Sequence, residues 1–258
     1  MQEWLLALVD ELATGDEVGW LVSGSIARGE AHAHSDVDLT RFTADGPSGY
    51  RAKYGLQYWQ GRLVSVTNRT VEVAQRELES VSGAIWAVEG LRQARILRDP
   101  TGAIATLQAQ AHAFDWAPLR PTARDWVSYR IAHAAEEVHK LLGLRQQGDL
   151  GGLANATMGL NLTIGYAMAV DREVLFRSEN RWIDQVLEAV GAETPWADAF
   201  RQSLGLTALG RTSAPIWGQS AGALQLYAET VILVAQRMHA ADRTVALEAV
   251  ARIRREGF

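Results

Sequence analysis

The segment 24–39 constrains the fold of this chain more than any other part of the sequence. It begins with Gly24, directly after an apolar run, and ends with residues 36–39, in which aspartates alternate with valine and leucine. Alternation with a period of two is typical of a half-buried strand, so Asp36 and Asp38 are expected on one face while the apolar side chains enter the core. The segment therefore predicts two neighbouring strands that carry a glycine turn and a pair of carboxylates.

The two carboxylates indicate a metal site. Like charges on one strand face repel each other, and their pKa values separate unless a cation neutralises them. Mg²⁺ is held in proteins by one or two carboxylates together with phosphate oxygens of a substrate. We therefore predict Asp36 and Asp38 as metal ligands and as catalytic residues. Because an Asp-x-Asp pair also occurs on solvated strand faces, this prediction depends on the glycine turn that precedes it.

The glycine turn indicates a phosphate site. A strand that ends in Gly24-Ser25 before a helix leaves backbone N–H groups free at the start of that helix. Glycine lets a phosphate approach the backbone, the Ser25 hydroxyl adds a donor, and the helix dipole favours an anion. Arg28, about one helical turn further on, is within reach of a terminal phosphate. Gly24, Ser25 and Arg28 are therefore predicted to bind a nucleoside triphosphate beside the metal, which indicates in-line attack on phosphorus.

The rest of the chain separates into two parts with different patterns. Strand and helix signals alternate up to a linker marked by Pro118 and Pro121, and after it only helical periodicity is found. The first part is expected to hold strands 20–22, 35–42, 54–59, 62–67 and 94–97 and helices 4–12, 25–31, 70–80, 84–91 and 103–113. The second part is expected to hold helices 122–147, 153–170, 181–190, 196–204, 214–237 and 240–254. The sequence thus predicts an α+β fold, a mixed sheet with flanking helices in domain 1–117 followed by a helical bundle in domain 118–258.

At these residues the chain resembles a known family. Gly-Ser, a short spacer and Asp-x-Asp-Leu are similar to the signature of the DNA polymerase β-like nucleotidyltransferase superfamily. Ala-Arg-Gly at 27–29 and Ser-Asp at 35–36 resemble its bacterial branch of aminoglycoside, lincosamide and minimal nucleotidyltransferases. The resemblance implies Mg²⁺-dependent transfer of a nucleoside monophosphate, release of pyrophosphate, and a helical bundle that closes over the acceptor.

One departure from that family concerns a third carboxylate, which normally lies on a neighbouring strand. The matching position here is Ser65 in strand 62–67, and serine is neither a base nor a strong Mg²⁺ ligand. Glu72, just after the strand, is one candidate for the missing catalytic role. Glu136 or Glu137 in the helical half is another. The third alternative is a protein that binds nucleotide and catalyses poorly or not at all.

The helical half offers one further chemical pattern. His133, Glu137 and Lys140 fall at i, i+4 and i+7, which places them on one helical face. If that face lines the cleft, Glu137 is predicted as a catalytic base and Lys140 as a nucleotide-binding residue. The alternative is a solvated helix face with ordinary ion pairs.

Histidines and aromatic residues elsewhere are interpreted more simply. His32 and His34, which precede the metal strand, are expected on the surface rather than as ligands. Some aromatic side chains are able in principle to stack a base or a ring-shaped acceptor, but core packing is the expected role of each; these are Tyr58, Trp59, Trp182, Trp196 and Trp217.

Composition narrows the class of protein. The chain has no cysteine, which excludes disulfides, thiolate metal sites and a cysteine nucleophile. Its formal net charge of −5 disfavours binding of long nucleic acid, which needs clustered positive charge, and weakly favours a cationic acceptor. No stretch approaches the roughly 20 apolar residues of a membrane span, and the N-terminus lacks the basic start of a secretory signal. We therefore expect a cytoplasmic protein without a membrane partner.

Residues and resemblance together lead to one expected function. It is Mg²⁺-dependent transfer of a nucleoside monophosphate, AMP from ATP, to a hydroxyl of a small molecule such as an aminoglycoside-like antibiotic. Two alternatives stay open: transfer of AMP to a protein hydroxyl, as in regulatory or toxin–antitoxin systems, and a catalytically degenerate nucleotide-binding protein with Ser65 in place of the third acid.

Overall fold

The computed structural model describes residues 3–206 and 215–258 and separates the chain into two compact units. The first unit extends to Trp116 and includes a short segment from much later in the sequence, Leu175–Glu179. The second unit holds Ala117–Val174 and Asn180–Phe258. The division after Trp116 lies close to the expected boundary, but the return of 175–179 to the first unit has no counterpart in the sequence analysis.

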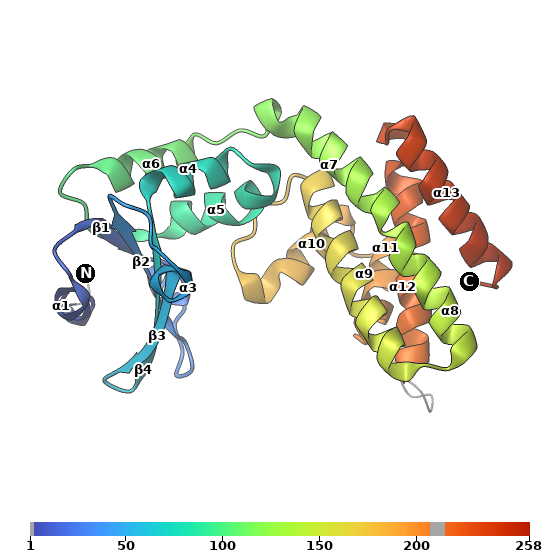
Figure 1. Ribbon diagram of the computed structural model, residues 1–258, viewed down its shortest axis with the longest axis horizontal. Helices are drawn as coiled ribbons and strands as arrows, with labels where there is room; N and C mark the ends of the chain where they lie inside the picture. The colour runs from blue at the N-terminus through green and yellow to red at the C-terminus, as the bar shows by residue number, and fades with distance from the viewer. Residues whose placement is uncertain (1–2, 207–214) are drawn as a thin grey trace. The chain divides into compact units, whose positions relative to one another are not determined.

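The first unit is built on a five-stranded sheet with the strand order β3-β4-β2-β1-β5 (Figure 1). Its strands are β1 (Glu17–Val22), β2 (Val37–Thr43), β3 (Tyr54–Trp59), β4 (Arg62–Arg69) and β5 (Arg95–Arg98). β2 and β4 run parallel, whereas the pairs β1–β2, β1–β5 and β3–β4 are antiparallel. The sheet is therefore mixed, and the predicted α+β fold class is confirmed.

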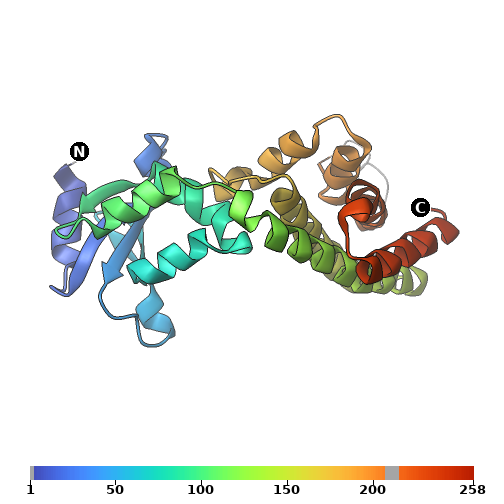
Figure 2. The same cartoon turned by 90° about the horizontal axis from the view of Figure 1, so that it is seen from above.

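Helices cover both faces of this sheet. They are α1 (Glu3–Leu12), α2 (Gly24–Arg28), α3 (Tyr50–Lys53), α4 (Val71–Leu78), α5 (Val81–Gln93) and α6 (Ala103–His112). α1 packs its buried face, including Leu8, into one core cluster with Trp20. α6 lies on the other face, since a Cβ on Gly19, the neighbour of Trp20, would come within 2.6 Å of Ile104 Cδ1 (Figures 1 and 2).

The β3–β4 hairpin forms as the sequence predicts, and it places β3 at an edge of the sheet. Its turn, Gln60-Gly61, has positive φ at both residues, 47° and 77°. This is the two-residue turn whose twist matches that of the flanking strands. α3, which precedes the hairpin, was not predicted, because a single helical turn is too short to show an amphipathic period.

The second unit is helical throughout its described part. Its helices are α7 (Arg120–His133), α8 (Ala135–Gln147), α9 (Leu150–Asp171), α10 (Trp182–Val190), α11 (Pro195–Ser203), α12 (Pro215–Val234) and α13 (Ala240–Arg255), with short 3-10 turns at Ala117–Leu119 and Ala235–Arg237. A third 3-10 turn, Glu179–Arg181, begins at the last residue of the first unit. The start of the expected helix 214–237 lies outside the described residues. Within the described part of the chain, none of the helices combines the length and the apolar character needed to cross a membrane.

Two details explain how the second unit packs. The expected continuous helix 122–147 is interrupted at Ala134, which ends α7 and begins α8. The long α9 has no charged side chain before Asp171 and contacts α7, α8 and α12. Two buried hydroxyls are hydrogen-bonded inside this core: Tyr227 donates to the Ile131 carbonyl at 3.1 Å, and Thr230 Oγ1 accepts from Trp196 Nε1 at 2.8 Å.

Candidate active site

The glycine turn and the second aspartate of the 24–39 segment are in direct contact. Ser23, which follows β1, donates its N–H to the Asp38 main-chain carbonyl at 2.9 Å. Gly24 has a φ of +67°, and a Cβ built on it would clash with Asp38 Oδ2. The carboxylate therefore occupies the space that a side chain at Gly24 would need. Glycine is required here both by the left-handed backbone and by the approach of the carboxylate.

The carboxylate pair lies at the start of β2. Val37 and Leu39 are 0% and 2% exposed and enter the core, which confirms the predicted alternation. Asp38 lies half-buried on the opposite face, and Asp36 comes directly before the strand rather than within it. The aspartates thus lie at the end of the central strands, where β1 leads into α2.

The electrostatic surroundings of Asp38 are dominated by negative charge. Burial, the charge of Asp36 and the charge of Glu179 raise the pKa of the Asp38 carboxyl above its usual range. A hydrogen bond from Ser65 and the charge of Arg28 act in the opposite direction but do not cancel the rise. A carboxyl group in these surroundings favours binding of a cation, because a cation offsets the repulsion from the neighbouring negative charges and stabilises the ionised form.

Ser65 occupies the position predicted for it. It pairs with Asp38 in the parallel β2–β4 ladder, and its hydroxyl donates to Asp38 Oδ1 at 3.0 Å. No third acid therefore stands beside Asp38 on β4. Among residues 3–206 and 215–258, no group of three or more His, Asp or Glu side chains is arranged to hold a metal ion by itself. A metal at this site would depend on two carboxylates and on oxygens from the substrate.

The segment Leu175–Glu179 is part of the site, and the sequence analysis did not find it. The Phe176 N–H donates to the Ile85 carbonyl at 2.6 Å, and the Phe176 ring, 2% exposed, packs on Trp86 with 4.4 Å between ring centroids. Two residues later, Glu179 acts on Asp38 through its charge. No local sequence pattern marks this segment, because its partners lie far away along the chain.

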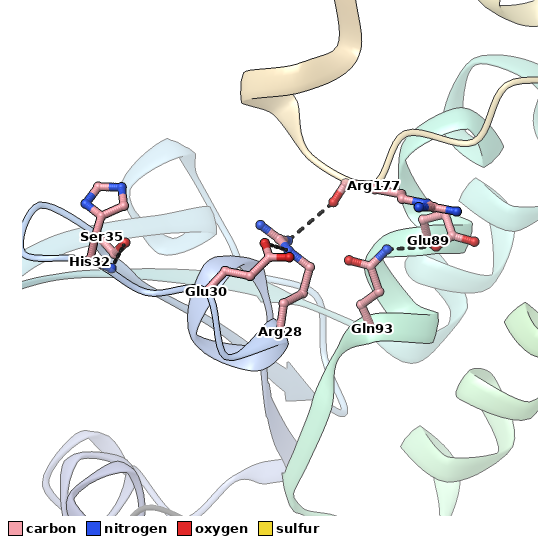
Figure 3. A network of polar contacts seen from close by, with 7 residues as sticks. All are labelled: Arg28, Glu30, His32, Ser35, Glu89, Gln93 and Arg177. Atoms are coloured by element: carbon pink, nitrogen blue, oxygen red, sulfur yellow. Dashed lines mark hydrogen bonds and ion pairs between the residues drawn. The ribbon is translucent and has the colours of Figure 1, made fainter. Parts of the chain in front are cut away.

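Arg28 connects this segment to the glycine turn (Figure 3). Its Nη1 donates to the Arg177 main-chain carbonyl at 3.3 Å, and its Nε donates to Glu30 Oε2 at 2.7 Å. The charge of Arg177 acts on the Glu89 carboxylate, which Figure 3 shows next to the Arg177 guanidinium. Arg28 is therefore held at the end of α2 by two partners, and its positive charge acts to lower the pKa of Asp38.

Phe176→Ala is expected to destabilise the first unit. Truncation of a fully buried phenylalanine costs about 3–5 kcal/mol, and here it also releases the backbone that holds Arg28. Urea unfolding followed by circular dichroism measures the loss. Phe258→Ala is the matched control, because Phe258 is 38% exposed and its truncation is expected to cost less than about 1 kcal/mol. Equal losses in both variants would contradict the assigned role of Phe176.

Glu72 does not lie at the site. β2 and β4 are parallel and Asp38 pairs with Ser65 near the start of β4, whereas Glu72 follows the far end of that strand. Thr70 lies five residue steps beyond Ser65, about 16 Å at roughly 3.3 Å per residue. A hydrogen bond from its own backbone N–H and one from the Thr70 hydroxyl lower the pKa of the Glu72 carboxyl. The prediction that Glu72 reaches the site is therefore wrong: Glu72 lies in the first turn of α4, whose N-cap is Thr70.

Glu137 and Lys140 lie in the second unit and pair with each other. Lys140 Nζ is 2.8 Å from Glu137 Oε1 and 2.9 Å from Glu136 Oε1, and these bonds raise the pKa of Lys140. His133 belongs to α7 and stacks on Tyr129 with 3.8 Å between ring centroids. The predicted stripe is thus interrupted at Ala134. The roles of Glu137 as a base and Lys140 as a phosphate ligand stay predictions.

The remaining histidines and aromatic residues divide into three groups. His32 and His34 are exposed, as expected, and organise their own loop: the His34 N–H donates to His32 Nδ1 at 3.2 Å. Trp59 and Trp196 are core residues, and Trp182 and Trp217 are half-buried. Tyr58 does not follow the expectation, because it is 77% exposed rather than packed in the core.

Comparisons with known proteins bear on the fold. No family model matches the chain, and no curated protein matches it. Among solved structures, the chain is similar to a nucleotidyltransferase-like protein from Exiguobacterium sibiricum 255-15, with 14% sequence identity and a TM-score of 0.51 over 90% of this chain and 76% of that one. The chain therefore has a nucleotidyltransferase-like fold. The aminoglycoside and lincosamide branch stays a prediction.

Proposed function

We propose that this protein is a Mg²⁺-dependent nucleotidyltransferase that moves AMP from ATP to a hydroxyl group of a small molecule. The observation that carries the proposal is the contact between Gly24 and Asp38, in which only a glycine leaves room for the carboxylate. This contact joins a backbone turn suited to phosphate with a carboxylate suited to a metal. A nucleoside triphosphate complexed with Mg²⁺ needs both at once.

The residues present fit Mg²⁺. Asp36, Asp38 and Glu179 bring negative charge to one place, and Arg28 is the cation that acts on Asp38 among them. Asp36 and Asp38 would hold the ion, since Mg²⁺ needs only one or two carboxylates when phosphate oxygens complete its shell. When bound there, the ion supplies neutralisation of the charge on the transferred phosphate and its leaving group.

The triphosphate is assigned to the start of α2. The first N–H groups of a helix have no partner inside it, so those of Gly24 and Ser25 are available to phosphate oxygens. The Ser25 hydroxyl adds a donor, and the Arg28 guanidinium adds a charge already oriented by Glu30 and the Arg177 carbonyl. These groups hold the leaving pyrophosphate beside the carboxylate pair.

The reaction balances as a simple displacement. The acceptor oxygen forms a bond to the α-phosphorus, and the bond from that phosphorus to the oxygen bridging the α- and β-phosphates breaks. Pyrophosphate leaves with the electron pair, and the hydroxyl proton passes to a base. Ser65 cannot be that base, so Glu137 remains the candidate from the sequence.

Ser65 favours one alternative function. A site that keeps two aspartates and lacks the third acid is also suited to binding a nucleotide without transferring it. AMP transfer to a protein hydroxyl uses the same residues and differs only in the acceptor.

Isothermal titration with a non-hydrolysable ATP analogue, with and without Mg²⁺, tests the proposal, followed by a pyrophosphate-release assay across acceptors. We expect Mg²⁺-dependent binding of the analogue and release of pyrophosphate from ATP when an acceptor is present. Binding without release for every acceptor supports the degenerate alternative. Absence of Mg²⁺-dependent binding contradicts the proposal.

A further inference from the structure

The edge strand β3 carries an exposed apolar stripe. Tyr54, Leu56 and Tyr58 are 51%, 58% and 77% exposed, and because they are two residues apart they share one face of the sheet. We call these three residues the β3 stripe. Two tyrosines and a leucine side by side on a solvent-accessible strand form the kind of surface that indicates a ligand or partner.

The β3 stripe lies on the same face as the carboxylate site. Leu56 pairs with Ser65 across β3 and β4, and Ser65 pairs with Asp38 across β4 and β2. Directly paired residues of neighbouring strands point to the same side, and the Ser65–Asp38 hydrogen bond of 3.0 Å confirms it for this row. Strands lie about 4.8 Å apart, so Leu56 is about 10 Å from Asp38.

The other face of β3 has a different environment. Trp59 is 9% exposed, joins the core cluster beneath α1 and stacks on Trp4 with 6.1 Å between centroids. Its indole N–H donates to Glu11 Oε2 at 2.7 Å. One face of β3 is therefore packed toward α1, and the exposed β3 stripe lies on the opposite face, which also carries Asp38.

The chemistry of displacement defines which side the acceptor approaches from. In an in-line reaction the attacking oxygen and the leaving group lie on opposite sides of the phosphorus. The pyrophosphate is assigned to α2, which follows β1 on one side of β2, whereas β4 and β3 lie on the other side. This inference rests on the proposed function. We propose that the β3 stripe binds the acceptor by contacting an apolar or aromatic ring of the acceptor next to its reacting hydroxyl.

The composition of the β3 stripe defines the class of acceptor. Tyrosine rings and a leucine side chain bind flat rings by stacking and by burial of apolar area. A polycationic acceptor would need carboxylates, and the β3 stripe has none. The acceptor is therefore a hydroxyl compound with an uncharged ring, which differs from the cationic acceptor expected from net charge.

Binding of two probes tests this inference. Phenyl β-D-glucoside joins a flat ring to free hydroxyls, and kanamycin is a polycationic aminoglycoside. Each is titrated by saturation-transfer NMR against the full chain loaded with Mg²⁺ and a non-hydrolysable ATP analogue. Tyr58→Ser and Leu56→Ser remove parts of the β3 stripe, whereas Gln57→Ser changes an exposed residue of the opposite face of the same strand and is the matched control.

We expect saturable binding of phenyl β-D-glucoside that weakens about tenfold in Tyr58→Ser and Leu56→Ser and stays unchanged in Gln57→Ser, a loss typical of removing one packed side chain. Affinity for the ATP analogue is expected to stay unchanged in all three variants. Failure of the glucoside to bind, an equal loss in Gln57→Ser, or preferential binding of kanamycin that ignores the β3 stripe would overturn the inference. If the ATP analogue fails to bind the chain without substitutions, that result counts against the proposed function instead.

Discussion

Asp38→Asn is expected to abolish Mg²⁺-dependent nucleotide binding and to lower nucleotidyl transfer by about a hundredfold or more, the scale of losing a group that acts in the transition state. The reason is that Asp38 is one of the two carboxylates assigned to the metal and the one that contacts the glycine turn. Asp36→Asn is expected to act in the same direction. Isothermal titration with the ATP analogue and the pyrophosphate-release assay measure the two effects.

Asp45→Asn is the matched control for this pair. Asp45 is an exposed aspartate just after the far end of β2, so the same change of charge takes place in the same unit away from the site. We expect it to keep nucleotide affinity. If Asp38→Asn kept its affinity as well, the assignment of Asp38 to the metal would be wrong.

The same substitution has a second expected result in the absence of nucleotide. Burial and the charges of Asp36 and Glu179 raise the pKa of Asp38 in the folded state above its value in the unfolded state. Between these two pKa values the folded state therefore binds more protons than the unfolded state. The contribution of Asp38 to stability therefore falls as pH rises from the usual aspartate pKa through the raised one. Asp38→Asn is expected to remove this dependence and to raise the thermal stability of the nucleotide-free protein near neutral pH.

Gly24→Ala is expected to eliminate nucleotide binding, because the added methyl group displaces the Asp38 carboxylate from the space beside residue 24. The added Cβ clashes with Asp38 Oδ2, and the φ of +67° costs an L-residue about 1–2 kcal/mol in addition. Asp38 must move away from the metal position or the turn must open, and either change separates the phosphate and metal halves of the site. Titration with the ATP analogue measures the loss of binding, and urea unfolding measures the loss of stability.

Gly102→Ala separates the two causes. Gly102 has a φ of +76°, and nothing lies within 4 Å of a Cβ built on it, so its substitution adds backbone strain without a clash. We expect a smaller loss of stability than in Gly24→Ala, about 1–2 kcal/mol, with normal nucleotide binding. Equal binding in Gly24→Ala and Gly102→Ala would show that the approach of Asp38 to the turn has no functional role.

The carboxylate site shows how far local patterns reach. The alternation at residues 36–39 predicts which side chains enter the core, and Val37 and Leu39 are buried as it requires. The alternation in strand 62–67 likewise predicts that Ser65 faces the site, which the hydrogen bond to Asp38 confirms. These predictions succeed because a strand repeats every two residues, so each side chain's face depends on its immediate neighbours.

Predictions that depend on pairing between distant strands were less successful. Glu72 is near Ser65 in the sequence, but the parallel pairing of β2 and β4 places it at the opposite end of the strand. Tyr58 is an aromatic residue on a strand, and only its position on an edge strand, on the uncovered face, explains why it is exposed. Strand order and direction are properties of the whole sheet and leave little trace in one segment.

By itself, the sequence determined the fold class, the hairpin and the juxtaposition of a glycine turn with two aspartates, since each follows from periodicity and backbone preference within a few residues. The tertiary structure alone decided that Leu175–Glu179 returns to the first unit, where the Arg177 carbonyl accepts a hydrogen bond from Arg28, 149 residues away in the sequence. The physical reason is that such a contact forms only when burial of Phe176 against Trp86 outweighs the conformational entropy lost in closing the chain, a balance set by the complete fold.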